Sequence, residues 1–243
     1  MRSILAGWLA GFGLLILDCG PVSALIGADF ADLTVQRYTV AVGSTKGICN
    51  GVVLAQDVVL TAAHCVEDAG NLWIGGNRGW GAPTDPPVML GAVARAITHP
   101  DFARGRYGAP DLALLKLTKP LPDRFTPVFI DPRPAGRDSN LIAAGYGKNA
   151  EDDSGAGRIL RMVLLRTEQA GNDYLTLAST QANPRTGGPG DSGSPVFTYR
   201  GMHALAGIIV TGTPTRAMAI PIAPNYRWIR ETMDSLDAPK GEP

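Results

Sequence analysis

The sequence has no excess of either charge. Among its 243 residues, 22 lysines and arginines balance 22 aspartates and glutamates, and no run of basic residues occurs. A protein that binds nucleic acid or an anionic membrane through charge needs a basic patch or stripe. The composition therefore predicts neither nucleic acid nor a membrane surface as a partner of the mature chain.

Cysteine and histidine are also scarce, with three residues of each type. Their positions give no spacing typical of a metal site. Glu67 and Asp68 offer carboxylates, but no later carboxylate completes a calcium-binding loop with them. The sequence therefore predicts no metal ion and no other cofactor.

Glycine and proline, in contrast, are abundant, at 30 and 19 residues. Many turns between short runs of valine, isoleucine and leucine favour an all-β fold. The length and the 45% apolar content suffice for a full core, either as one large domain or as two small ones. No internal repeat or low-complexity tract is present, and no membrane-spanning segment follows residue 25.

The first 24 residues predict a cleaved signal peptide, and hence a secreted or periplasmic protein. Arg2 supplies the positive start, residues 4–17 form an apolar run, and small residues occupy positions 22–24. One alternative is an uncleaved membrane anchor, although the apolar run is shorter than the ~20 residues that span a bilayer. Lipidation at Cys19 is the other.

Export bears on the remaining cysteines. Cys49 and Cys65 would form an even pair in an oxidising compartment, which predicts one disulfide. It would close a loop of about 15 residues and contribute about 3 kcal/mol. Two buried free thiols are the alternative.

Strands are expected wherever short β-branched or apolar stretches lie between turn residues. Residues 70–90 predict only loops, and the prolines of residues 120–134 predict a linker between two halves. A helix is expected from Asn225 as its cap, because Ile229 and Met233 fall on one face. The expected strands cover residues 38–43, 48–54, 57–63, 92–100, 112–117, 141–147, 158–167, 174–180, 194–199 and 204–212.

Two polar residues lie at strand ends. His64 follows a strand and precedes Cys65, which predicts a rigidly held imidazole, although a buried structural histidine would fit equally well. Asp111 stands directly before an apolar strand, so it is either exposed or paired with a hydrogen-bond donor. His99 and Asp101 are better explained as a turn.

Residues 187–196 read GGPGDSGSPV and concentrate four glycines around one hydroxyl. Glycine adopts backbone conformations closed to other residues, so amide N–H groups can converge beside the Ser192 hydroxyl. Acyl transfer needs such donors, together with a base and an orienting acid. Ser192 is therefore the candidate nucleophile.

Three segments carry a resemblance to a known family. TAAHC around His64, DLALLKL from Asp111 and GDSGSP around Ser192 resemble, in this order, the signature segments of the chymotrypsin-like (trypsin-fold) serine proteases. The resemblance implies two packed six-stranded antiparallel β-barrels, with the catalytic cleft between them and a C-terminal α-helix. The implied domains are the barrels at residues 25–130 and 131–224 and the helix and tail at 225–243.

The resemblance also implies roles. Ser192 would attack the scissile carbonyl, His64 would act as general base and acid, and Asp111 would orient the imidazole. The N–H groups of Gly190 and Ser192 would form the oxyanion hole. Cys49 lies where the family's disulfide to the cysteine after the histidine begins.

Further implied roles concern activation and specificity. Asp191 would pair with a new N-terminal amine at Leu25, directly after the predicted signal cleavage and without a zymogen stage. Thr186 would form the floor of the primary pocket, with Gly212 and Ala217 on its walls. Because no aspartate stands at the floor, we expect a small or medium apolar P1 residue and no Arg/Lys specificity.

Two departures from the family pattern weaken the implied site. Val210 and Thr211 replace a serine that bonds the triad acid and a tryptophan that lines the substrate cleft. The main prediction is a secreted, monomeric serine endopeptidase acting on protein or peptide substrates and open to protein inhibitors. The alternatives are a catalytically silent homologue acting as a binding module and, less well matched, an esterase on another fold.

Overall fold

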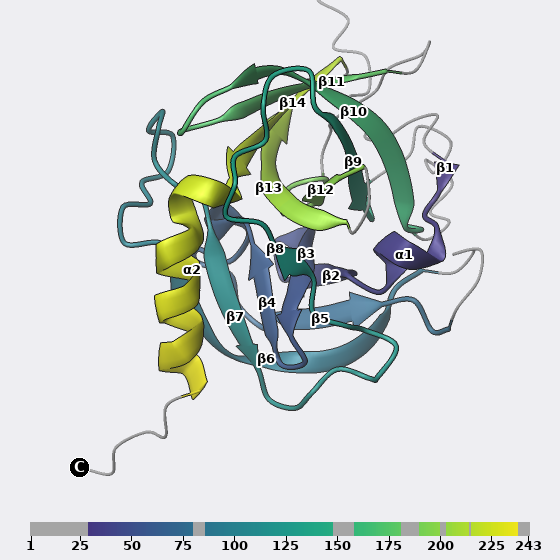
Figure 1. Cartoon of the computed structure of the whole chain (residues 1–243). Helices are drawn as coiled ribbons and strands as arrows, with labels where there is room; N and C mark the ends of the chain where they lie inside the picture. Colours follow the sequence, from purple (N-terminus) through teal and green to yellow (C-terminus); the bar gives the residue numbers. More distant parts are fainter. Residues whose placement is uncertain are drawn as a thin grey trace, which may run out of the picture.

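Two six-stranded β-barrels account for most of the chain in the computed structural model (Figure 1). The structure describes residues 29–79, 86–147, 158–180, 190–199, 203–213 and 215–237. The predicted fold class is confirmed, since two antiparallel barrels are followed by one long helix. The predicted signal peptide, residues 1–24, lies outside the described residues.

The first barrel is closed by antiparallel strands in the order β2-β3-β4-β7-β6-β5. Its strands are rich in buried apolar residues, and Val40, Val52 and Leu60 are completely buried. The strands are β2 (Thr39–Ser44), β3 (Gly47–Ala55), β4 (Val58–Thr61), β5 (Trp73–Gly76), β6 (Val88–Thr98) and β7 (Ala113–Leu117).

The prediction that residues 70–90 form only loops is wrong. β5 lies in this segment and pairs with both β2 and β6, so it completes the barrel. Its sequence, WIGG, joins two strand-favouring residues to two glycines that disfavour strands, and tertiary packing decides its conformation. The glycines make room for an indole ring, because a Cβ on Gly43 or Gly75 would lie 2.0 Å or 2.7 Å from Trp73 ring atoms.

The second barrel is closed by pairing of β9 with β10. Two short strands extend it: β1 (Asp29–Phe30) pairs antiparallel with β10, and β8 (Phe129–Ile130) pairs parallel with β13. β8 comes from the predicted linker, which therefore also contributes to the second sheet. The barrel strands are β9 (Asn140–Gly145), β10 (Arg161–Ala170), β11 (Leu175–Ser179), β12 (Pro195–Thr198), β13 (Ala204–Gly212) and β14 (Arg216–Pro221).

One apolar core joins the two barrels. The buried Tyr146 and Phe197 of the second half belong to the same cluster of side chains as Val42 of the first. The ring of Tyr38, directly before β2, lies 5.9 Å from the ring of Phe197 in β12, centroid to centroid. Because this interface is tightly packed, residues contributed by both barrels can keep fixed positions relative to one another.

Within the described residues, two helices flank the barrels. α1 (Leu33–Gln36) is a single turn capped by Asp32, and α2 (Ile222–Asp237) follows β14 directly. α2 begins three residues before the predicted cap, and Asn225 lies inside it, where its Nδ2 donates to the carbonyl oxygen of Pro221 at 2.8 Å. No helix within the described ranges has the length and apolar content that crossing a bilayer requires.

α2 packs back along the first barrel (Figure 1). The ring of Trp228 lies 4.6 Å from that of His99, which follows β6 and is almost fully buried. Burial lowers the pKa of His99, and the Asp101 carboxylate, 4.0 Å away, partly opposes this. In the unfolded chain His99 takes up a proton near its ordinary pKa of about 6.5, whereas the folded chain resists protonation.

The pH dependence of stability follows from this difference. The contribution of His99 to stability is complete above the unfolded pKa and is lost as the pH falls below it. We expect the Tm to decrease between pH 7.5 and pH 5, and to decrease less in a His99→Phe variant, which keeps the aromatic contact. Calorimetry of both proteins at several pH values measures this, and equal slopes would contradict it.

Candidate active site

His64 lies on a short 3-10 turn, Ala63–Cys65, that is separated from the end of β4 by one residue. Cys65 forms the predicted disulfide with Cys49 of β3. The turn is therefore fixed at one side by a strand and at the other by a covalent bond. This confirms the disulfide and gives His64 the rigid support that its position in the sequence predicts.

Asp111 contacts His64 through both carboxylate oxygens. Oδ2 lies 2.6 Å from the imidazole Nδ1, and Oδ1 accepts a hydrogen bond from the His64 backbone N–H at 2.9 Å. Strand register explains the meeting, because β4 and β7 are neighbours and Thr61 pairs with Ala113. With Val210 in place of a hydroxyl residue, the backbone N–H of His64 supplies the second contact to Asp111.

Ser192 lies between the barrels on the segment before β12. Its backbone carbonyl accepts a hydrogen bond from the N–H of Asn50 at 2.8 Å, and its hydroxyl donates to the carbonyl of Val210 at 3.5 Å. Among the described residues, no hydrogen bond joins the Ser192 hydroxyl to His64. The structure therefore brings Asp111 to His64 directly, and Ser192 reaches a neighbouring backbone carbonyl instead.

Glycine is required at two positions beside Ser192. Gly193 has φ +80°, and a Cβ there would lie 2.0 Å from the carbonyl oxygen of Asn50. Gly190 has φ +96°, and its Cβ would lie 2.5 Å from Nη1 of Arg158. Both positions have a left-handed backbone that favours glycine, and at Gly193 the close approach to another backbone also excludes a side chain.

Arg158 is a residue of this region that the sequence did not indicate. Its guanidinium donates to the carbonyl of Ile48 at 3.2 Å and lies against Gly190. Burial lowers the pKa of Arg158, and the negative charge of Asp191, itself almost completely buried, partly offsets this effect. The guanidinium of Arg158 thus provides a positive charge near the Asp191 carboxylate in the folded chain.

Asn50 is the second such residue. It is completely buried in β3, and its side-chain Nδ2 donates to the carbonyl of Gly190 at 2.7 Å. One signal was available in the sequence, because asparagine is disfavoured in strands and Asn50 interrupts an apolar one directly after Cys49. Its partners lie some 140 residues away, so no local pattern could indicate them.

The predicted specificity residues are only partly described. Gly212 and Ala217 face one another across β13 and β14, and Ala217 is completely buried in an apolar cluster with Ile209. Thr186 and Leu25 lie outside the described residues, as does most of the glycine-rich segment before Gly190.

A hollow of about 310 Å³ lies beside Asp111. Its walls come from the loop before Asp111 and from the ends of the second-barrel strands. The rings of Tyr107 and Tyr174 lie on it with centroids 4.9 Å apart. Asp111 itself lines the hollow, as does Val210, whose carbonyl accepts the Ser192 hydroxyl, so the hollow adjoins the candidate site.

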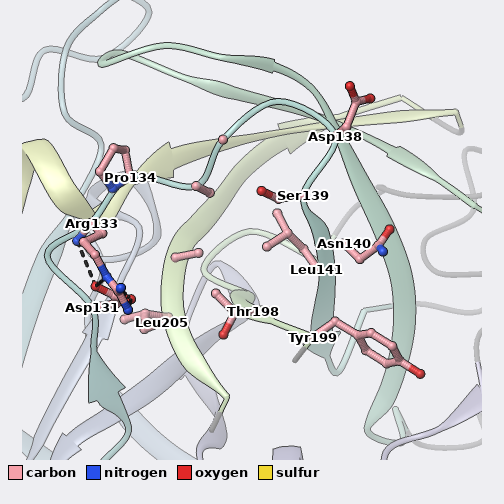
Figure 2. Close-up of a pocket in the computed structure, with 13 residues that line it drawn as sticks. Asp131, Arg133, Pro134, Asp138, Ser139, Asn140, Leu141, Thr198, Tyr199 and Leu205 are labelled. Carbon is pink, nitrogen blue, oxygen red and sulfur yellow. Dashed lines mark hydrogen bonds and ion pairs between the residues drawn. The ribbon is translucent and has the colours of Figure 1, made fainter. Parts of the chain in front are cut away.

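A larger hollow, of about 570 Å³, lies at the opposite end of the second barrel (Figure 2). Residues at the start of β9, at the start of β13 and at the end of β12 line this hollow. Ser192 and Val210 lie near the opposite ends of β12 and β13. Figure 2 shows the ion pair of Arg133 and Asp131 on one side and Tyr199 on the other. This hollow is therefore separate from the candidate active site.

Cys49, His64 and Cys65 place three potential metal-binding atoms within 4.8 Å of one another. Both sulfurs are bonded in the disulfide and cannot act as thiolate ligands. The Nδ1 atom of His64 is already directed at Asp111. The cluster is thus the structural support of the imidazole.

Comparison with known proteins decides the family. The family model described as Trypsin matches residues 25–229. The chain belongs to the trypsin family. Membership makes it a serine endopeptidase, in agreement with the signature segments that contain His64, Asp111 and Ser192.

Mouse kallikreins are among the relatives of this protease. Kallikrein 1-related peptidase b8 of Mus musculus is 27% identical, over 89% of this chain and 93% of its own length. Kallikrein 1-related peptidase b3 of the same organism is 31% identical with the same coverage. Neuropsin, a serine protease of mouse brain, has a similar structure with a TM-score of 0.69, at 20% identity over 86% of this chain and 100% of its own.

Removing the disulfide is expected to destabilise the protease. The bond closes a loop with a sequence separation of 16 residues, which corresponds to about 3 kcal/mol in the chain-entropy model. For a protein of this size the Tm of a Cys49→Ala/Cys65→Ala variant should fall by about 6–12 °C. A reducing agent should lower the Tm of the parent protein by a similar amount and should not change the Tm of the variant. A variant with the same Tm as the untreated parent protein would contradict the prediction.

Proposed function

We propose that the protease is a secreted endopeptidase that cleaves peptide bonds through an acyl-enzyme on Ser192. The observation that carries the proposal is the double contact of Asp111 with His64, at 2.6 Å and 2.9 Å. This contact fixes both the position and the tautomer of the imidazole, because a carboxylate at Nδ1 requires the proton there. Nε2 lies 3.7 Å from the Cys65 sulfur, which has no proton to donate in the disulfide, so the Nε2 lone pair can accept a proton.

The reaction would proceed in two steps. The Ser192 Oγ attacks the carbonyl carbon of the scissile bond while its proton passes to His64 Nε2. The tetrahedral intermediate expels the amine, which takes that proton from His64. Water then hydrolyses the acyl-enzyme by the same route, with His64 again as base and acid.

Ser192 must rotate before it can react. In the structure its hydroxyl is directed at the carbonyl of Val210 through a long contact of 3.5 Å. A rotation about χ1 moves a serine hydroxyl between staggered positions at little cost, and catalytic hydrogen bonds often form only with substrate bound. The N–H groups of Gly190 and Ser192 are proposed to stabilise the oxyanion.

The substrates proposed are proteins and peptides with a small or medium apolar P1 residue. No acidic residue stands at position 186, which would form the floor of the primary pocket, so an Arg or Lys side chain has no counter-charge there. The hollow beside Asp111, with Tyr107 and Tyr174, offers an adjoining surface for residues before P1. A peptide library varied at P1 tests this, and cleavage only after Arg or Lys would contradict it.

The amine of Leu25 is proposed to pair with Asp191 once the signal peptide has been removed. Burial of the Asp191 carboxylate supports a cationic partner for it, and the disulfide supports export to an oxidising compartment. N-terminal sequencing of the protein recovered from the medium or periplasm tests both statements. A start several residues away from Leu25, or recovery only from the cytoplasm, would contradict them.

Covalent labelling tests the catalytic proposal. A fluorophosphonate should react with Ser192, forming an Oγ–P bond and releasing fluoride, and peptide hydrolysis should be lost in parallel. Peptide mapping distinguishes Ser192 from Ser194, whose side chain is completely buried two residues along. A folded protein that neither becomes labelled nor hydrolyses peptides would favour the alternative, a silent homologue that acts as a binding module.

A further inference from the structure

Asn50 joins three separate parts of the chain at the candidate active site. Its Nδ2 donates to the carbonyl of Gly190 at 2.7 Å and to that of Ser192 at 3.3 Å. Its Oδ1 accepts the backbone N–H of Tyr146 at 2.7 Å, at the end of β9. The side chain belongs to the first barrel, so it bonds the Ser192 segment and the second barrel to β3.

The backbone of Asn50 adds two more bonds. Its N–H donates to the carbonyl of Ser192 at 2.8 Å, and its carbonyl accepts the hydroxyl of Thr61 at 2.6 Å. Every polar group of the residue therefore has a partner, and the amide orientation is fixed because two carbonyls face Nδ2 while an N–H faces Oδ1. Asn50 itself is completely buried, and a buried side chain whose polar groups are all bonded holds its partners in one arrangement.

The bonded carbonyls belong to the two residues whose N–H groups are proposed to bind the oxyanion. Fixing the carbonyl oxygens of Gly190 and Ser192 restricts rotation of the backbone from Gly190 to Gly193. Gly190 is the position where such restriction matters most, because glycine at φ +96° has no side chain to limit its own rotation. Donors aimed in advance at a developing oxyanion are effective because they need no reorganisation.

We propose that Asn50 is a positioning residue, which holds the N–H groups of Gly190 and Ser192 in the orientation that stabilises the transition state. The inference rests on the proposed catalytic function of Ser192. Asn50 touches no substrate in this scheme and acts only through the Gly190–Ser192 backbone. Its loss should therefore lower kcat and leave KM nearly unchanged.

An Asn50→Asp variant gives the sharpest test, because it keeps the shape and replaces only the NH₂ group. When protonated, the new carboxyl can still donate one bond to Gly190, but when ionised it repels both carbonyls. We expect the ratio of its kcat to that of the parent protein to fall as the pH rises from 6 to 9. At pH 9 the loss should be about 10²- to 10³-fold, with KM changed less than about threefold.

The matched control is Asn225→Asp. This residue is also a buried asparagine whose Nδ2 donates to a backbone carbonyl, that of Pro221 at 2.8 Å, but it lies in α2. It should keep the kcat of the parent protein at every pH, whatever its Tm. A general effect of a buried carboxyl would instead lower kcat in both variants and would overturn the proposal.

An Asn50→Gly variant decides the case if Asn50→Asp does not fold. It keeps the backbone bond to Ser192 and removes only the side chain, so kcat should fall at least about tenfold with KM unchanged. A folded Asn50 variant with the kcat of the parent protein would overturn the inference alone. A parent protein without hydrolysis or fluorophosphonate labelling would overturn the proposed function, and this inference with it.

Discussion

Replacing Asp111 with asparagine is expected to lower kcat by about 10⁴, the size of the loss known for this exchange in a serine-protease triad. The two contacts to His64 explain why. Oδ1 accepts the backbone N–H of His64, and only an oxygen can do so. The amide nitrogen of an asparagine would then face Nδ1 at the position of Oδ2 and donate to it.

The imidazole would be held in the wrong tautomer. With Nδ1 as acceptor, the proton lies on Nε2, the atom that must receive the proton of Ser192. Peptide hydrolysis under saturating substrate measures the loss, and KM should change little because Asp111 makes no proposed contact with substrate. Asp101→Asn is the control, since this exposed carboxylate lies beside His99. A kcat loss of less than about tenfold for Asp111→Asn would contradict the assignment.

Replacing Ser192 with alanine is expected to have the largest effect, a loss of about 10⁶ in kcat. The nucleophile is removed while the proposed oxyanion donors and the binding surface stay in place. A residual acceleration of about 10³ to 10⁴ over the uncatalysed reaction should therefore remain. Peptide binding to the variant should be measured with a product-like peptide acid. A peptide aldehyde is unsuitable, because it binds by reacting with the Ser192 hydroxyl that the variant lacks.

The residues of a triad act as a unit, so a double variant provides a second test of the prediction. A Ser192→Ala/Asp111→Asn double variant should be no slower than Ser192→Ala alone. Ser194→Ala is the control, because the Ser194 side chain makes no hydrogen bond within the described part of the chain. Additive losses in the double variant, or full loss in Ser194→Ala, would contradict the proposed roles.

The contacts of the candidate site that the sequence predicted depend on short segments with strong local character. His64 and Asp111 were predicted at strand ends, and the register of β4 against β7 brings them together. The disulfide was predicted from only two cysteines. In these cases the residue type and its place next to a strand carry the information.

The features that sequence did not reveal depend on distant contacts. β5 was missed because Trp73 fits only against glycines, one in β2 and one in its own strand. Glycine does not favour a strand by itself. The start of α2 was placed too late because Pro224, a helix breaker in the interior, is tolerated in the first turn. The proposed role of Asn50 depends on a bond to a loop 140 residues away in the sequence, which no local pattern indicates.

The position of α2 has a consequence for the order in which the protease can form. The first barrel is synthesised before the second, yet His99 reaches its buried contact only with Trp228, close to the C-terminal end of the chain. A nascent chain that still lacks α2 therefore leaves the side of its first barrel around His99 uncovered.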